Sequence, residues 1–206
     1  TLVFSFVQYA SQMVKDKDLI RRLKLSICTL VGKMMKNKKY ISFKDEIQFK
    51  YQTLEKLVEW TSDFKLRVEG SVDKDDERFF IHLDNRCLMA IACLLEGLEI
   101  EKLRRDEDST ITEKERQLNN KREFQKYFRF LSRYLKKCQS KDNIDSKNQL
   151  RQFTINALGN LLEANINFGL TSFFRISYFK EHETRSAFLA VLTNIIKKGI
   201  NLVMKQ

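Results

Sequence analysis

The stretch Phe188–Val203, FLAVLTNIIKKGINLV, decides the fold class. Its apolar face recurs every third or fourth residue for more than four turns. The residues on this face are Phe188, Val191, Leu192, Ile195, Ile196, Gly199, Ile200 and Val203. This is the spacing of one side of an α-helix, whereas a half-buried strand would alternate apolar and polar residues. The stretch therefore predicts a long amphipathic helix.

The same periodicity recurs upstream. Apolar stripes at helical spacing lie within Leu150–Leu161, Phe124–Cys138, Cys87–Leu98, Ile47–Val58 and Ile20–Met34. The short aromatic segment 173–179 lies between the stripe in Leu150–Leu161 and the stripe in Phe188–Val203. In all, the pattern predicts about seven or eight helices and no convincing strand. The 206 residues include no Pro and only 6 Gly, which argues against a turn-rich β protein.

The predicted fold class is therefore all-α, either an irregular α-solenoid of the HEAT or armadillo kind or a multi-helix bundle. No sequence repeat is visible, so a solenoid would have to be degenerate. We expect an upstream helical segment at 1–98, a charged linker or mobile loop at 99–111, and a second helical segment at 112–206. The alternative is one continuous domain.

Capping residues indicate where several helices begin and end. Asp18 is the expected N-cap of the helix that carries the Ile20–Met34 stripe, and Gly97 is an expected C-terminal stop. Thr112 and Glu115 have the spacing of a capping box, in which each side chain bonds the backbone of the other residue.

Polar stretches separate the predicted helices. Loops are expected at about 70–76 and 139–147. The helices that contain Trp60 and Cys87 are expected to begin near Ser42 and Asp84, respectively.

Basic residues exceed acidic ones by 38 to 27, which gives a formal net charge of +11. Two clusters are candidate docking patches: Lys33, Lys36, Lys38 and Lys39, and Arg133, Lys136, Lys137 and Lys141. Each could attract phosphates, an anionic membrane or an acidic protein tail, and the alternative is a solvated helix end. The aromatic residues near the second cluster fall on an apolar stripe, so nucleic acid is the least favoured partner.

Several enzyme classes lack their signatures. The glycines are isolated, so no phosphate loop exists, and neither GxSxG nor HExxH occurs. The only histidines, His82 and His182, are far apart, and Asp75-Asp76 lies in a charged stretch typical of a solvated face. We therefore predict no catalytic, cofactor or metal site.

The four cysteines form no CxxC pair and are expected to be buried thiols in a reducing cytosol. No signal peptide or transmembrane helix is indicated.

A more specific pattern lies in residues 157–170, ALGNLLEANINFGL, followed by Tyr178 and Thr184-Arg185. This run resembles an Asn-Leu-Leu-x-Ala-Asn-x-x-x-Gly-Leu segment of neurofibromin and the yeast inhibitory regulators of Ras, the Ira proteins. The resemblance covers roughly residues 33–199 in the same order. Further similar positions are Met34-Met35, Phe43, Glu46, Phe49-Lys50, Leu57–Trp60, Leu83-Asp84, Leu94–Leu98, Phe188–Thr193 and Gly199.

The resemblance implies a large cytosolic helical scaffold that switches Ras off by accelerating its GTP hydrolysis. The family's catalytic arginine lies in a Leu-Phe-Arg-Gly-Asn-type loop, followed by a Pro-Ala pair. The nearest match here, Phe173–Ser177, lacks the Gly-Asn, and the chain contains no Pro. We therefore expect the helical region immediately upstream of the GTPase-activating (GAP) domain, itself not an enzyme.

The implied partners are the GAP domain of the same chain and Ras through the full-length protein. Tubulin, a Spred-type regulator protein, anionic membrane and a second copy of the full-length protein are further candidates. The implied location is the cytoplasm, with peripheral association with the membranes where Ras resides. The alternative function is a basic interaction module for an acidic partner such as tubulin or an anionic membrane.

Overall fold

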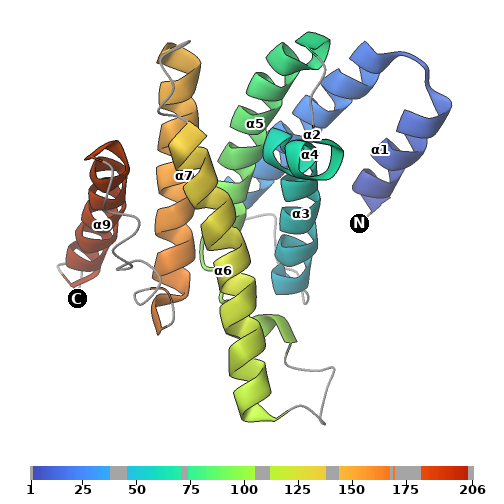
Figure 1. Ribbon diagram of the computed structural model, residues 1–206. Helices are drawn as coiled ribbons and strands as arrows, with labels where there is room; N and C mark the ends of the chain where they lie inside the picture. Colours follow the sequence, from blue (N-terminus) through green and yellow to red (C-terminus); the bar gives the residue numbers. More distant parts are fainter. Residues whose placement is uncertain are drawn as a thin grey trace. The chain divides into compact units, whose positions relative to one another are not determined.

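A computed structural model describes residues 2–37, 46–70, 74–104, 112–137, 144–167, 169 and 182–203 of the chain. These residues form eight α-helices, a 3-10 helix and no strand (Figure 1). The predicted all-α class is confirmed, and the choice between solenoid and bundle stays a prediction. The chain divides into two compact units, Thr1–Leu94 and Leu95–Gln206.

The first unit contains five helices: α1 (Leu2–Met13), α2 (Lys17–Lys36), α3 (Glu46–Trp60), α4 (Ser62–Glu69) and α5 (Lys74–Leu95). α1 packs against α2, and Thr61 alone separates α3 from α4. The fully buried side chains come mainly from α3 and α5, as predicted for Leu54, Leu57, Cys87, Ile91 and Leu94. The start predicted near Ser42 lies outside the described residues.

The start of α2 differs from the prediction. The N-cap is Asp16, whose Oδ1 accepts the backbone N–H groups of Asp18 at 2.9 Å and Leu19 at 3.1 Å. Asp18, the predicted cap, lies in the first turn and pairs with Arg21. A carboxylate can take either place, because both put negative charge at the positive end of the helix dipole.

The buried side of α2 is also rotated from the predicted stripe. Leu30 is 52% exposed, whereas Cys28 and Met35 are buried. Periodicity predicted a helix correctly, but the choice between adjacent positions depended on the neighbouring helices.

α5 begins at Lys74, ten residues before the predicted start at Asp84. Residues 74–76 of the expected loop at 70–76 therefore belong to the helix. Asp76 lies in its first turns and binds the Arg21 guanidinium of α2. The same guanidinium lies 5.3 Å from the centre of the Phe79 ring. These contacts stabilise a charged segment whose own sequence carries little apolar periodicity.

The second unit contains η2 (Ile100–Arg104), α6 (Glu113–Lys137), α7 (Ile144–Ala164) and α9 (His182–Val203). α7 packs against both α6 and α9, and η2 packs against α6 (Figure 1). Aromatic rings pack together in the interior. The centre of the Phe128 ring lies 5.8 Å from the centre of the Phe124 ring and 6.1 Å from the centre of the Phe188 ring. The predicted stripe is buried from Phe124 to Leu135, Phe130 is buried as well, and Cys138 lies outside the described residues.

Three expectations need correction here. Residues 99–111 were expected to be a linker, yet Ile100–Arg104 is helical and Ile100 is buried. Residues 144–147 were expected in a loop, but they belong to α7. Ile196 was placed on the buried face of α9, but it is 58% exposed. The predicted positions at 105–111, 139–143 and 173–179 lie outside the described residues.

The capping box before α6 is confirmed. The Glu115 carboxylate accepts the backbone N–H of Thr112 at 3.0 Å, and the Thr112 hydroxyl accepts the backbone N–H of Glu115 at 3.4 Å. A further bond of 2.8 Å joins the two side chains. Bonding to the Thr112 side chain, and then to its backbone, lowers the pKa of Glu115.

Candidate docking surfaces

The first predicted patch lies at the C-terminal end of α2. Lys33 and Lys36 are exposed in its last turns, while Lys38 and Lys39 lie outside the described residues. The backbone N–H of Asn37 closes the helix on the carbonyl oxygens of Lys33 and Met34. Positive charge is favoured here by the helix dipole, so the two exposed lysines have a structural reason to be present.

The second predicted patch lies at the end of α6. Arg133 is half-buried and Lys136 is exposed. Lys137 is the last residue of α6, and its side chain lies outside the description, as does all of Lys141.

The basic surface of α6 extends further than predicted. Between residues 121 and 136, every exposed position is Lys or Arg: Lys121, Arg122, Lys126, Arg129 and Lys136. Five basic residues follow alternating steps of four and three, which places them on one helix face. We call this set the basic stripe: Arg122, Lys126, Arg129, Arg133 and Lys136. The prediction missed its first half because it considered residues clustered in sequence rather than at helical spacing.

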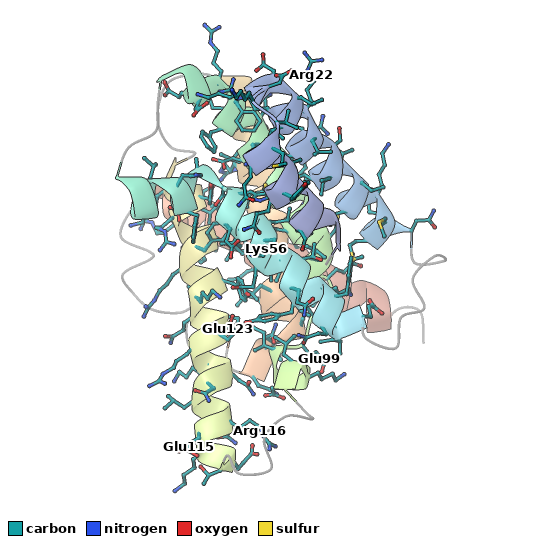
Figure 2. The ribbon with its side chains drawn as sticks, turned by 90° about the vertical axis from the view of Figure 1, so that its right-hand side faces the viewer. Arg22, Lys56, Glu99, Glu115, Arg116 and Glu123 are labelled. Atoms are coloured by element: carbon teal, nitrogen blue, oxygen red, sulfur yellow. The ribbon has the colours of Figure 1, made fainter. Side chains whose placement is uncertain are left out.

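The basic residues of the stripe differ in their contacts with described groups. Glu123 pairs with Lys126 at 3.2 Å, and the Lys126 ammonium lies 5.2 Å from the centre of the Tyr127 ring. In the described part of the chain, no carboxylate lies within 4.0 Å of the charged groups of Arg122, Arg129 or Lys136. Glu115 and Arg116 lie near the start of α6, with Glu123 further along it (Figure 2).

Asn165, directly after α7, is a buried polar side chain that makes three hydrogen bonds. Its Oδ1 accepts the backbone N–H of Ile100 at 2.8 Å. Its Nδ2 donates to the carbonyl oxygens of Leu98 at 3.0 Å and Leu161 at 2.9 Å. The amide thus fixes the chain that leads into η2 against the end of α7, and we call this group of bonds the Asn165 clamp.

Two glycines lie beside the Asn165 clamp. Gly97 has a φ of 67°, a left-handed conformation that ends α5 as predicted and that side chains disfavour. Gly169 donates its N–H to the Asn165 carbonyl oxygen at 2.9 Å. A Cβ at Gly169 would lie 2.9 Å from Leu162 Cδ2 and 3.3 Å from the Phe124 ring, so a larger residue would push the core apart.

In the first unit, two nucleophilic groups meet in the interior. The Cys28 and Cys87 Sγ atoms are 3.6 Å apart and both residues are fully buried, as predicted. Cys93 is only partly buried, contrary to the prediction, and Cys138 lies outside the described residues. Burial raises the pKa of the Cys87 thiol well above its usual value, and the bond with Cys28 raises it further. Because the thiolate is the reactive form, Cys87 is a weak nucleophile at neutral pH.

The titratable residues singled out earlier have separate roles. His82 is exposed, whereas Asp84 is buried and accepts bonds from the Ser62 backbone N–H at 2.8 Å and from the Ser62 hydroxyl. Asp84 of α5 thereby caps α4, since the N-cap Thr61 makes no side-chain cap bond. Asp76 forms an ion pair with Arg21.

Among the described residues, no group of three or more His, Cys, Asp or Glu side chains is placed to hold a metal ion. None of the helices, over the same residues, is long and apolar enough to cross a membrane. A scan against models of known protein families matches none of them. The described residues thus present exposed positive charge on α2 and α6 and bury apolar side chains in each unit.

Proposed function

We propose that this chain is a non-catalytic helical scaffold segment of a Ras GTPase-activating protein, a negative regulator of Ras signalling. In this role it supports the downstream GAP domain and offers a docking surface. The proposal rests on the sequence resemblance to neurofibromin and the Ira proteins. The all-helical structure is compatible with it.

The observation that supports the proposal most is the Asn165 clamp. Two of the runs that carry the resemblance, Leu94–Leu98 and residues 157–170, meet through the bonds of Asn165 to Leu98 and Ile100. Gly97 and Gly169, which belong to the same runs, are required by backbone conformation and by close packing. Gly97, Asn165 and Gly169 of these runs thus have architectural roles, as a scaffold requires.

The non-catalytic part of the proposal rests on the sequence. Phe173–Ser177 lacks the Gly-Asn of the family's arginine-finger loop, and this segment lies outside the described residues. A finger arginine acts by placing positive charge on the phosphoryl group in the transition state. Without that loop, the chain is expected to leave the chemistry to the downstream domain.

The test is single-turnover GTP hydrolysis by Ras, with this chain alone and with a longer chain that continues into the downstream domain. We expect no acceleration by the chain alone and acceleration by about 10³–10⁵ with the longer one. Acceleration by orders of magnitude with the chain alone would contradict the non-catalytic role. No acceleration with either would contradict the family assignment.

The second candidate function is a basic interaction module for an acidic partner such as tubulin or an anionic membrane. The net charge of +11 and the exposed lysines of α2 and α6 favour it. Binding to tubulin or to anionic vesicles should weaken steeply as salt is raised. Under both candidates, we propose a cytoplasmic protein that associates peripherally with membranes where Ras resides, with homodimerisation a property of the full-length protein.

A further inference from the structure

We propose that the basic stripe of α6 is a docking site for a flexible, Asp- and Glu-rich segment of a partner protein. The inference extends the docking part of the proposed function and uses only the charges and exposure of α6. It does not depend on Ras, so the binding test below and the hydrolysis test above can fail independently.

The first argument is the length and regularity of the stripe. Arg122 and Lys136 are fourteen residues apart in α6, which corresponds to about 21 Å along the helix axis. Three further positive charges lie between them on the same face. An extended chain of about six or seven residues covers this distance, so one short acidic segment can contact every charge of the stripe.

The second argument is that four of the five charged residues of the stripe are accessible to a partner. Arg122, Lys126, Arg129 and Lys136 are exposed, and only Lys126 has an ion pair with a described carboxylate, Glu123. Both members of that pair lie on the same helix, and such pairs contribute only about 0.3–0.5 kcal/mol. At Arg122, Arg129 and Lys136, an incoming carboxylate therefore displaces no ion pair with a described carboxylate.

The third argument concerns the alternatives. No exposed apolar residue lies between residues 121 and 136, so this face has nothing to insert into a lipid bilayer or to pack against an amphipathic partner helix. The aromatic rings of this stretch, Phe124, Tyr127, Phe128, Phe130 and Tyr134, are all buried, so none can stack on a nucleobase. Positive charge without exposed apolar or aromatic neighbours fits carboxylates on a flexible chain best.

The test measures the binding of a fluorescein-labelled polyglutamate peptide of about ten residues to the whole chain by fluorescence anisotropy, at about 50 mM salt. The stripe variant carries Arg122→Gln, Arg129→Gln and Lys136→Gln. The matched control carries Lys17→Gln, Arg22→Gln and Arg78→Gln, which removes two Arg and one Lys that are also exposed, on α2 and α5, and that belong to neither predicted patch. Arg22 is labelled in Figure 2. Both variants lose the same net charge.

We expect the stripe variant to bind about tenfold more weakly, as three exposed ion pairs would predict, and the control to stay within about twofold of the unchanged chain. Circular dichroism establishes that both variants are folded. The single change Arg129→Glu, in the middle of the stripe, gives the same direction if the triple variant does not fold.

Three results would overturn the proposal. The first is no binding of the peptide at low salt. The second is equal weakening of peptide binding in the stripe and control variants, which would show that net charge alone explains the binding. The third is tighter, stripe-dependent binding of single-stranded oligouridine or of phosphatidylserine vesicles than of the peptide. That result would assign the stripe to nucleic acid or to membrane.

Discussion

The two units of this protein join their helices in different ways. In the first, polar side chains of α5 contact other helices: Asp76 binds Arg21, Asp84 caps α4 and Cys87 meets Cys28. In the second, α6, α7 and α9 enclose an apolar interior whose largest side chains are aromatic, with the Asn165 clamp at its edge. Aromatic burial is nondirectional and scales with area, whereas a buried polar contact is directional and costly when one partner is lost.

This difference predicts how each unit responds to substitution. The second unit should lose most stability when a large ring is truncated, because the cavity left behind cannot close fully. The first should be sensitive to the loss of single polar atoms. Trp60, the only tryptophan, lies in the first unit, so its fluorescence reports on that unit, while circular dichroism reports on all helices.

The largest effect is expected for Phe128→Ala. The ring is buried between Phe124 and Phe188, so its loss should cost about 3–5 kcal/mol of unfolding free energy. Chemical denaturation followed by circular dichroism measures it. Leu118→Ala is the control, because Leu118 lies on the same helix but is 48% exposed. Equal losses in the two variants would contradict the proposed aromatic core.

The next effect is expected for Asn165→Ala, which breaks the Asn165 clamp. The N–H of Ile100 and the C=O of Leu98 would be left unpaired in a buried place, at a cost of about 2–3 kcal/mol. Amide hydrogen exchange at Ile100 should accelerate along with the global loss. Asn156→Ala, on the exposed side of α7, is the control and should change stability by less than about 0.5 kcal/mol. Unchanged exchange at Ile100 would show that the amide does not hold η2.

A smaller effect, about 1–2 kcal/mol, is expected for Asp84→Ala in the first unit. Ser62 then loses the acceptor for its backbone N–H at the start of α4. The Trp60 fluorescence transition should move to lower denaturant concentration. Asp84→Asn keeps an acceptor oxygen and should lose less, so a ranking in which Asn is worse than Ala would contradict the capping role.

The smallest effect concerns Lys24 and is a change in how steeply the free energy of unfolding varies with pH. Burial, and then the nearby Lys65 charge, lower the pKa of Lys24, while its ammonium lies 5.7 Å from the centre of the Trp60 ring. The folded state therefore binds fewer protons than the unfolded state between the lowered pKa and 10.5, so stability should rise with pH in that window. Lys24→Met should reduce this rise, and Lys36→Met, at an exposed site, should not. Equal slopes in the two variants would contradict the assignment.

The predictions from the sequence were correct where a feature depends only on residues close together in the chain. The capping box of Thr112 and Glu115, the stop at Gly97 and the buried stripe of α6 each depend on residues within a few turns. They were wrong where contacts between distant segments determine the structure. The ten residues at the start of α5 are helical and are contacted by Arg21, which lies more than fifty positions away, and Ile100 is buried against partners that include Asn165.

The candidate docking site was found only in part for a related reason. Arg133 and Lys136 were singled out because they lie near other basic residues in the sequence. Arg122, Lys126 and Arg129 belong with them only once the helix is continuous and its other face is known to be buried. The spacing was visible in the sequence, but exposure was not.

By itself, the sequence determined that this protein is helical, where α6 begins and α5 ends, and that it carries an excess of positive charge. Helical periodicity, caps and charge are properties of neighbouring residues, so they survive without knowledge of the fold. Only the tertiary structure decided which side of each helix is buried, which polar groups are paired across helices, and which basic residues remain exposed. Those outcomes depend on contacts between segments far apart in the chain, where burial and desolvation set the energies.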